Sequence, residues 1–207
     1  MPRARELRCE EIIFRLRRAR GMIRGDPLLK NEGGASHLSV IETERLSLRE
    51  LSGADAAFIL ELLNDPGFIR FIADRGVRTL EGAARYIEER FAESYRQHGF
   101  GLWLVETKEG KAPAGICGLL KRGAPVPGVE VGYAFLPQFR ARGYAFEAAS
   151  ASAVYARDVL GLPRLYAVVN PDNASSIRVL EKLGMRFERA VRLTGEEFDV
   201  NLFSTDL

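Results

Sequence analysis

Residues 129–145 read VEVGYAFLPQFRARGYA, and this short stretch combines a strand, a turn and the start of a helix. Its first seven residues are typical of a strand, and an alanine-rich helical pattern begins after Gly143. Free backbone N–H groups at a helix N-terminus bind anions such as phosphate, and Arg140 and Arg142 add positive charge beside them. The stretch is compatible with an anion site or with a structural turn, since it matches neither the dinucleotide fingerprint nor the P-loop.

The segments on either side of this stretch alternate between strand and helix patterns. Ser52 and Asp55 form a capping box at the start of one helix, which Asp65-Pro66 ends, and Thr79 can cap a second helix. In chain order, the predicted elements are a strand within 40–48, helices over 52–65 and 79–98, strands at 100–107, 114–121 and 129–135, a helix from 143 to about 161, a strand at 165–169, a helix at 173–183 stopped by Gly184, and a hairpin of 187–193 with 198–203.

The order of these elements predicts the fold class. Three consecutive strands predict an antiparallel meander, and the helix after them predicts a crossover to a parallel strand. The fold class is therefore α/β (α+β), with a mixed, mostly antiparallel sheet and flanking helices. In the helix over 79–98, apolar residues recur at helical spacing and should pack on the sheet as one stripe. The stripe consists of Leu80, Ala84, Ile87, Phe91 and Tyr95, and Gly99 stops the helix.

Composition excludes several classes of protein. The chain has 207 residues, 46% hydrophobic and 28% charged, which is typical of one globular domain with an appendage. His37 and His98 are the only histidines, and Cys9 and Cys117 the only cysteines. The sequence therefore indicates no disulfide framework, no metal site and no serine or cysteine triad. We interpret Cys117 as a small buried hydrophobe and Trp103 as a core or cleft-wall aromatic.

The beginning of the chain differs from the rest in charge. Residues 1–30 carry nine Lys or Arg and four Asp or Glu, a net charge of +5, whereas the remainder carries −3. We interpret this arm as a solvated helix or a non-native extension, with nucleic-acid binding as the alternative. The chain then divides into a basic extension and linker, 1–39, and a folded domain, 40–207. No apolar run approaches the ~20 residues that cross a bilayer, so we expect a cytoplasmic protein without membrane contact.

Two motifs in this chain resemble those of the GNAT superfamily of N-acetyltransferases. Residues 129–135 followed by 138–148 resemble its fourth strand and its Gln/Arg-x-x-Gly-x-Gly/Ala loop, which binds the acyl-CoA pyrophosphate. Residues 170–176, with 180–185, resemble its second cofactor segment. The resemblance runs from about residue 41 to the end of the chain, and it implies the GNAT fold with a splayed central strand pair.

The ends of the domain resemble one branch of the family. Residues 41–46 and 199–203 are similar to the RimJ/RimL-like acetyltransferases of ribosomal-protein N-termini. The resemblance implies direct transfer of an acetyl group from acetyl-CoA to a primary amine, either a protein N-terminus or a small molecule, without a covalent acyl-enzyme and without a metal. The alternative is a non-catalytic acyl-CoA-binding sensor or ribosome-associated module. We expect a monomer or homodimer.

The resemblance also assigns cofactor contacts residue by residue. The positions are Phe135, Arg140, Ala141, Arg142, Gly143, Tyr144, Ala145, Asn173 and Ser176. Asn173 is in addition a good helix N-cap, so capping is the alternative role of its side chain. Ala141 departs from the family, because the loop has its first glycine there. If the position needs a positive φ, alanine carries about 1 kcal/mol of strain.

Acetylation of an ammonium requires a base, and Glu130 is the candidate. A carboxylate partly desolvated in a cleft has a raised pKa, although Glu130 is alternatively a solvated or salt-bridged strand residue. Ser176 matches a helix serine that some members of the branch use near the sulfur to protonate the leaving thiolate; its alternative is a solvated helix position. Backbone amides near Phe135 would polarise the thioester carbonyl.

The acceptor is expected between two loops. In the family, acceptor pockets lie between the loop after the first helix, here residues 64–78, and the terminal hairpin. Glu196, Glu197 and Asp199 cluster in that hairpin and would attract a cationic amine, although they are equally compatible with a solvated turn. No residue type in either loop identifies the amine.

Overall fold

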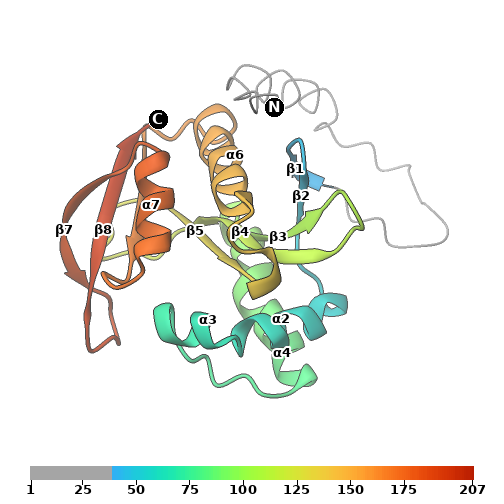
Figure 1. Ribbon diagram of the computed structural model, residues 1–207. Coiled ribbons are helices and arrows are strands. Elements are labelled where there is room, and N and C mark those ends of the chain that lie inside the picture. The colour runs from blue at the N-terminus through green and yellow to red at the C-terminus, as the bar shows by residue number, and fades with distance from the viewer. Residues whose placement is uncertain (1–38) are drawn as a thin grey trace.

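The computed structural model describes residues 39–207, in which one eight-stranded sheet carries helices on both faces (Figure 1). The strand order is β1-β2-β3-β4-β5-β6-β8-β7. The strands are β1 (Ser39–Glu42), β2 (Leu46–Arg49), β3 (Leu102–Thr107), β4 (Pro113–Leu120), β5 (Glu130–Phe135), β6 (Arg164–Val169), β7 (Arg186–Arg192) and β8 (Asp199–Asp206). All neighbours are antiparallel except β5 and β6, which confirms the predicted mixed sheet.

The helices follow the predicted capping residues closely. They are the 3₁₀ turn η2 (Gly53–Asp55), α2 (Ala56–Leu63), α3 (Pro66–Phe71), α4 (Leu80–Tyr86), the π-helical turn η3 (Ile87–Ala92), α5 (Glu93–His98), the 3₁₀ turn η4 (Pro137–Phe139), α6 (Tyr144–Asp158) and α7 (Ala174–Lys182). The Thr79 side chain accepts the Gly82 N–H at 3.0 Å and starts α4. Gly99 ends α5 with a φ of +72°, a conformation that glycine adopts without strain.

The Asp65-Pro66 pair begins a helix as well as following one. α2 ends at Leu63, close to the prediction, but the prediction missed α3. The Asp65 side chain accepts the Phe68 N–H at 3.0 Å, and Pro66 occupies the first helical position, where its missing N–H leaves no hydrogen bond unmade. An Asp-Pro pair therefore serves as a stop for one helix and a start for the next.

The predicted apolar stripe of the helix over 79–98 is wrong at its start. Leu80 is 56% exposed, and Ala83 is the residue of that turn that is fully buried. Ile87 and Phe91 are buried as predicted. The helix passes through the π-helical turn η3, which has a wider repeat than an α-helix, so a stripe counted at constant α-helical spacing does not hold along its whole length.

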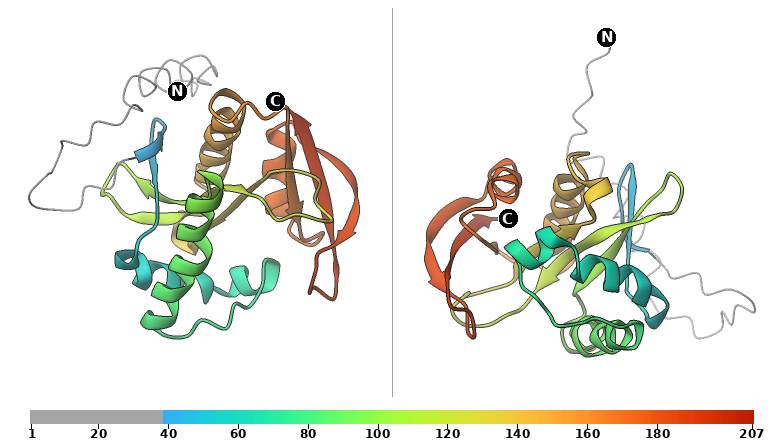
Figure 2. Two further views of the ribbon diagram at one scale, coloured as in Figure 1. Left: turned by 180° about the vertical axis from the view of Figure 1, so that it is seen from behind. Right: turned by 60° about the horizontal axis from the view of Figure 1, so that its bottom comes forward.

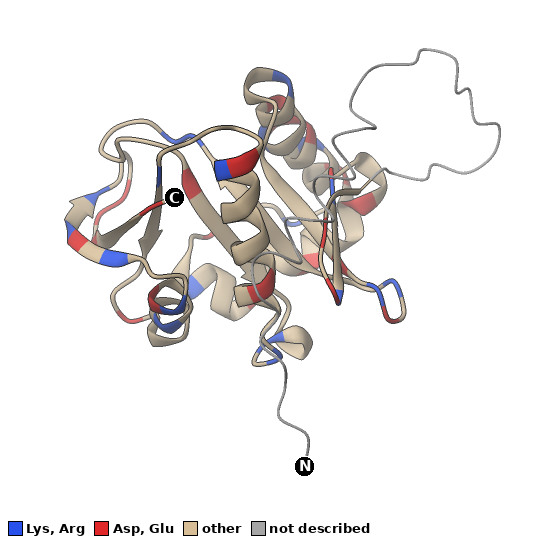
Figure 3. Cartoon of the chain, turned by 90° about the horizontal axis from the view of Figure 1, so that it is seen from above, with Lys and Arg blue, Asp and Glu red and all other residues tan. Residues whose placement is uncertain are grey.

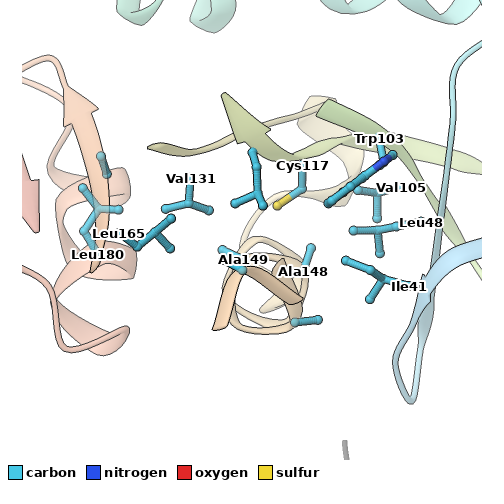
Figure 4. Close-up of a cluster of buried hydrophobic side chains, with 14 of the residues drawn as sticks. Ile41, Leu48, Trp103, Val105, Cys117, Val131, Ala148, Ala149, Leu165 and Leu180 are labelled. Atoms are coloured by element: carbon cyan, nitrogen blue, oxygen red, sulfur yellow. The ribbon is translucent and has the colours of Figure 1, made fainter. Parts of the chain in front are cut away.

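One core cluster lies between the sheet and α6 (Figure 4). Alanines of α6, including Ala148 and Ala149, pack toward β3, β4 and β5, because their short side chains let the helix lie close to the sheet. Trp103 and Cys117 are buried in this cluster, which confirms Trp103 as a core residue and Cys117 as a small hydrophobe. Burial raises the pKa of the Cys117 thiol to about 12, so the thiol stays neutral.

The second core cluster lies on the opposite face of the sheet, under α2 and α4 (Figure 2). Ile59 and Leu62 of α2 pack with Ile87 of the long helix and with Leu104 and Ile116 of the sheet. Both faces of the central strands β3, β4 and β5 are thus covered, which fixes the position of β5 in the middle of the molecule.

β5 and β6 run parallel but are paired at one end only. Their single registered pair is Glu130 with Tyr166, and the Tyr166 N–H donates to the Val129 carbonyl at 2.9 Å. On its other side β5 pairs with β4 as far as Phe135. The two strands therefore part beyond Glu130, as predicted for a splayed central pair, and this leaves backbone groups on their facing edges that need other partners.

Residues 1–38 lie outside the described part of the chain. The predicted basic extension and its alternative of nucleic-acid binding fall there, and the division of the chain at residues 39 and 40 stays a prediction. Within residues 39–207, no helix combines the length and the apolar character needed to cross a membrane.

Candidate active site

The loop between β5 and α6 adopts the conformation that an anion site requires. Ala141 has a φ of +58° and Gly143 a φ of +80°, so the position at which the sequence departs from the family does have a positive φ. Left-handed residues in such turns direct successive N–H groups into a concavity. At Ala141 the side chain carries about 1 kcal/mol of strain, as the sequence predicted for this case.

The start of α6 fits a phosphate group. Its N-cap is Gly143, which has no side chain, so no side-chain oxygen caps the first turn. The helix is 15 residues long, and its free N–H groups and dipole favour an anion at this end. The structure therefore offers an uncapped helix N-terminus next to a loop with two left-handed residues.

A network from the β1–β2 turn holds this loop in place. The Thr43 hydroxyl and the Arg45 backbone N–H donate to Glu147 of α6 at 2.5 and 3.0 Å, and Arg45 Nε donates to the same carboxylate at 2.6 Å. Arg45 Nη1 also donates to the Arg142 carbonyl at 3.0 Å, and the guanidinium lies 4.7 Å from the centre of the Tyr144 ring. Sequence analysis noted residues 41–46 only as a branch resemblance and missed their contact with the loop.

The Arg140 side chain turns away from the start of α6 and toward α3. Its Nε donates to the Phe135 carbonyl at 2.8 Å, and its Nη2 pairs with the Asp65 carboxylate that caps α3. Gly67 permits this approach, because a Cβ there would lie 3.0 Å from Arg140 Nη1. Arg140 thus ties the end of β5 to α3, and its predicted contact with the cofactor stays a prediction.

A cleft of about 1100 Å³ opens where β5 and β6 part. It is bounded by α3, the long helix, the start of α6, α7 and the β7–β8 turn. The predicted site residues that line it are Glu130, Phe135, Arg140, Ala141, Gly143, Tyr144, Ala145, Asn173 and Ser176. Arg142 does not line it, and its guanidinium lies 5.8 Å from the Phe139 ring centre.

Glu130 lies at the floor of this cleft. It is 1% exposed and pairs with Arg122 of the β4–β5 loop, whose Nε lies 3.0 and 3.4 Å from its two carboxylate oxygens. Burial raises the pKa of Glu130, and the Arg122 charge opposes this in part. The carboxylate is therefore both buried in a cleft and salt-bridged, which combines the two situations that the sequence offered as alternatives.

Tyr133 and Ser176 meet across the gap between β5 and α7. Their hydroxyls share a hydrogen bond of 2.8 Å, and the Tyr133 hydroxyl also donates to the Ser176 carbonyl at 3.2 Å. Burial raises the pKa of Tyr133 to about 12, so it stays protonated. Sequence analysis missed Tyr133 as a site residue. The available signal was a hydroxyl on the strand that was already expected to border the gap.

Asn173 caps α7. Its Oδ1 accepts the Ser176 N–H at 3.1 Å and the Ser175 hydroxyl at 2.8 Å, so the capping role is confirmed. A contact of its amide group with the cofactor stays a prediction. The cap also places the Ser176 side chain in the first turn of α7, at the edge of the cleft.

The acceptor loops contribute only in part. Gly67, Phe68, Phe71, Ile72 and Arg75 line the cleft from the segment 64–78, and Glu196 lines it from the terminal hairpin. Glu197 and Asp199 do not line it, and the Asp199 carboxylate instead pairs with Arg192 at 2.8 Å. Within residues 39–207, no group of three or more His, Cys, Asp or Glu is placed to hold a metal ion.

An anion-binding helix start beside two parted parallel strands characterises acetyltransferases that use acyl-CoA as donor. Residues 45–186 match the family model described as the acetyltransferase (GNAT) domain, and the chain belongs to this family. It is an acetyl-CoA-dependent N-acetyltransferase with the GNAT fold. The loop conformation and the uncapped start of α6 fit the pyrophosphate of this cofactor.

Comparisons with individual proteins agree with this assignment. The uncharacterized N-acetyltransferase YoaA of Bacillus subtilis is 30% identical over 169 residues, which cover 80% of this chain and 95% of that protein. A crystal structure of an acetyltransferase from Agrobacterium tumefaciens has 25% identity and a TM-score of 0.67, covering 84% of this chain and 98% of that one. The structure of RimL, a ribosomal L7/L12 alpha-N-protein acetyltransferase in complex with coenzyme A, has 15% identity and a TM-score of 0.70, covering 82% and 98%.

Proposed function

We propose that this enzyme acetylates a primary amine with Glu130 as the general base and Ser176 as the proton donor to the leaving group. The observation that carries the proposal is the place of Glu130. Its carboxylate is buried at the floor of the cleft, at the point where β5 and β6 part. A buried carboxylate with a raised pKa accepts a proton from an ammonium more readily than a solvated one.

The cofactor side of the cleft would hold the donor mainly through the backbone. When bound, acetyl-CoA supplies the acyl thioester and the leaving thiol. The N–H groups of residues 141–145 and the dipole of α6 would hold its pyrophosphate. Asn173 would add a side-chain contact, and backbone N–H groups near Phe135 would polarise the acyl carbonyl.

The Tyr133–Ser176 pair would handle the second proton. The shared hydrogen bond of 2.8 Å keeps the Ser176 hydroxyl oriented, and Tyr133, which stays protonated, replenishes the proton that Ser176 gives up. The proton of the amine goes to Glu130 and a proton from Ser176 goes to the thiolate, so the net charge of the cleft is restored when solvent re-equilibrates both groups.

The chain would belong to the RimJ/RimL-like branch. The support is the segment 41–46, where Thr43 and Arg45 bind the start of α6. RimL itself acts on the ribosomal protein L7/L12, so a protein N-terminal amine and a small-molecule amine are both acceptor classes to test.

The test is release of coenzyme A by the full chain from acetyl-CoA in the presence of amines. The panel contains free amino acids, N-terminal peptides and simple amines, and calorimetry measures acetyl-CoA binding in parallel. We expect saturable binding and steady release with one acceptor class. Binding without release for every acceptor would instead identify a non-catalytic acyl-CoA sensor.

A further inference from the structure

The floor of the cleft presents two opposite charges side by side. Glu130 is buried there, whereas the Arg122 side chain is 37% exposed and also lines the cleft. Arg122 uses only its Nε for Glu130. In the described part of the chain, no hydrogen bond or ion pair engages its Nη1 or Nη2. The guanidinium edge formed by these two nitrogens therefore remains available to a ligand.

This edge has the geometry to bind a carboxylate. The planar fork of arginine presents two parallel N–H groups, which match the two oxygens of a carboxylate. Glu130, on the Nε side of the same guanidinium, would receive an ammonium. A ligand that fits both groups must carry an amine and a carboxylate only a few bonds apart.

The walls around this pair are largely apolar. Phe71 and Ile72 line the cleft from α3, and Leu193 and Phe198 line it from the β7–β8 turn. Ile72 is 37% and Phe198 44% exposed, which leaves apolar surface available to a ligand side chain. Burial of this surface on binding would favour an apolar group next to the amine.

We propose that the acceptor is a free α-amino acid with an apolar side chain, held by its carboxylate on the Nη edge of Arg122 and by its amine on Glu130. This inference rests on the proposed function and narrows its substrate class. Arg122 is then the residue that selects free amino acids over amines without a neighbouring carboxylate. Glu196, in the same cleft wall, adds attraction for the ammonium.

The test compares two acceptors that differ only at the carboxylate. The full chain is assayed with acetyl-CoA and either L-leucine or L-leucinamide, and kcat/KM is measured for each. The amine of leucinamide is the less basic of the two, so a preference for leucine does not come from easier deprotonation. We expect the parent enzyme to prefer leucine, chiefly through a lower KM.

The variant Arg122→Gln should reduce the leucine-to-leucinamide ratio of kcat/KM by about 10- to 100-fold, the loss expected for a charge-assisted hydrogen bond. Arg122→Lys should restore part of the ratio through its charge. The matched control is Arg157→Gln, an exposed arginine outside the cleft that pairs with Asp158, and it should leave the ratio unchanged. Acetyl-CoA affinity, measured by calorimetry, shows whether each variant is folded.

Three outcomes would overturn the inference. Equal or better acetylation of leucinamide, or of a peptide N-terminus, by the parent enzyme would remove the carboxylate from recognition. An equal loss for both acceptors in Arg122→Gln would leave Arg122 with a general role toward Glu130. In both cases acetyl transfer continues, so the proposed function survives. If no amine supports release of coenzyme A, both the proposed function and this inference fail.

Discussion

Ala141 holds a left-handed conformation that favours glycine, in the loop that the cofactor needs. The sequence located this residue correctly as the departure from the family pattern, because the loop motif around it is specific. The strain is small compared with the free energy of unfolding of a domain. The loop is also held from outside, by Arg45 on the Arg142 carbonyl, so the backbone keeps its shape in spite of the methyl group.

The variant Ala141→Gly should relieve this strain. We expect the free energy of unfolding to rise by up to about 1 kcal/mol, because the relief exceeds the entropy that glycine adds to the unfolded chain. Denaturant unfolding followed by circular dichroism measures the change. Gly143→Ala is the matched control with the opposite sign, since Gly143 has a φ of +80°. A loss of stability in Ala141→Gly would contradict this account.

Glu130→Gln should lower kcat by about 10²- to 10⁴-fold near neutral pH, the usual contribution of a general base. The loss should shrink at alkaline pH, where the free amine forms without help. For the parent enzyme, kcat falls as the pH drops through the pKa of Glu130, which burial raises. Acetyl-CoA affinity should stay nearly unchanged. An identical pH profile for parent and variant would remove Glu130 from the mechanism.

Ser176→Ala should lower kcat by about 10²-fold, because the leaving group loses its proton donor. Tyr133→Phe should cost less, since Tyr133 acts through the Ser176 hydroxyl to which it is hydrogen-bonded. The double variant should be no slower than Ser176→Ala, because the two hydroxyls form one pathway. Steady-state rates of the three variants form the cycle, and additive losses would show that the hydroxyls act independently.

Among the elements, α3 shows most clearly what the sequence could not reveal. Asp-Pro is an end signal and a start signal at once, and only the carboxylate's bond to the Phe68 N–H decides that a helix follows. The π-helical turn η3 was equally hidden, because no residue type specifies it. In contrast, Thr79, Gly99 and Gly184 marked their helix ends correctly, since each acts through its own side chain or its own φ.

Asp65→Ala should destabilise the protein by about 1–2 kcal/mol and raise the KM of the acceptor. The change removes the N-cap of α3 and the partner of Arg140, so the wall that carries Phe71 and Ile72 loses its anchor to the cofactor loop. Thr79→Ala removes an N-cap outside the cleft and is the control. It should lower the stability by a similar amount without changing KM, and an equal KM for the two variants would contradict the role of α3.

For the molecule as a whole, the sequence predicted contents better than connections. The order of strands, the loop and the cleft residues followed from local patterns and from two specific motifs. The pairs Arg45–Glu147 and Arg140–Asp65 join residues 102 and 75 positions apart, and no local pattern announces them. The Arg122–Glu130 pair is near in sequence, yet its importance depends on burial, which only the packed sheet determines.

The parting of β5 and β6 has a consequence for association between molecules. Strand edges with unpaired N–H and C=O groups are templates for aggregation, and proteins normally shield them. Here the outermost strands are shielded: β1 is four residues long and bulged, and β7 carries interspersed basic and acidic residues (Figure 3). The edges that must stay open for a ligand face each other inside the sheet. A slender cofactor arm can enter there, but the strand of a second molecule has no room to dock.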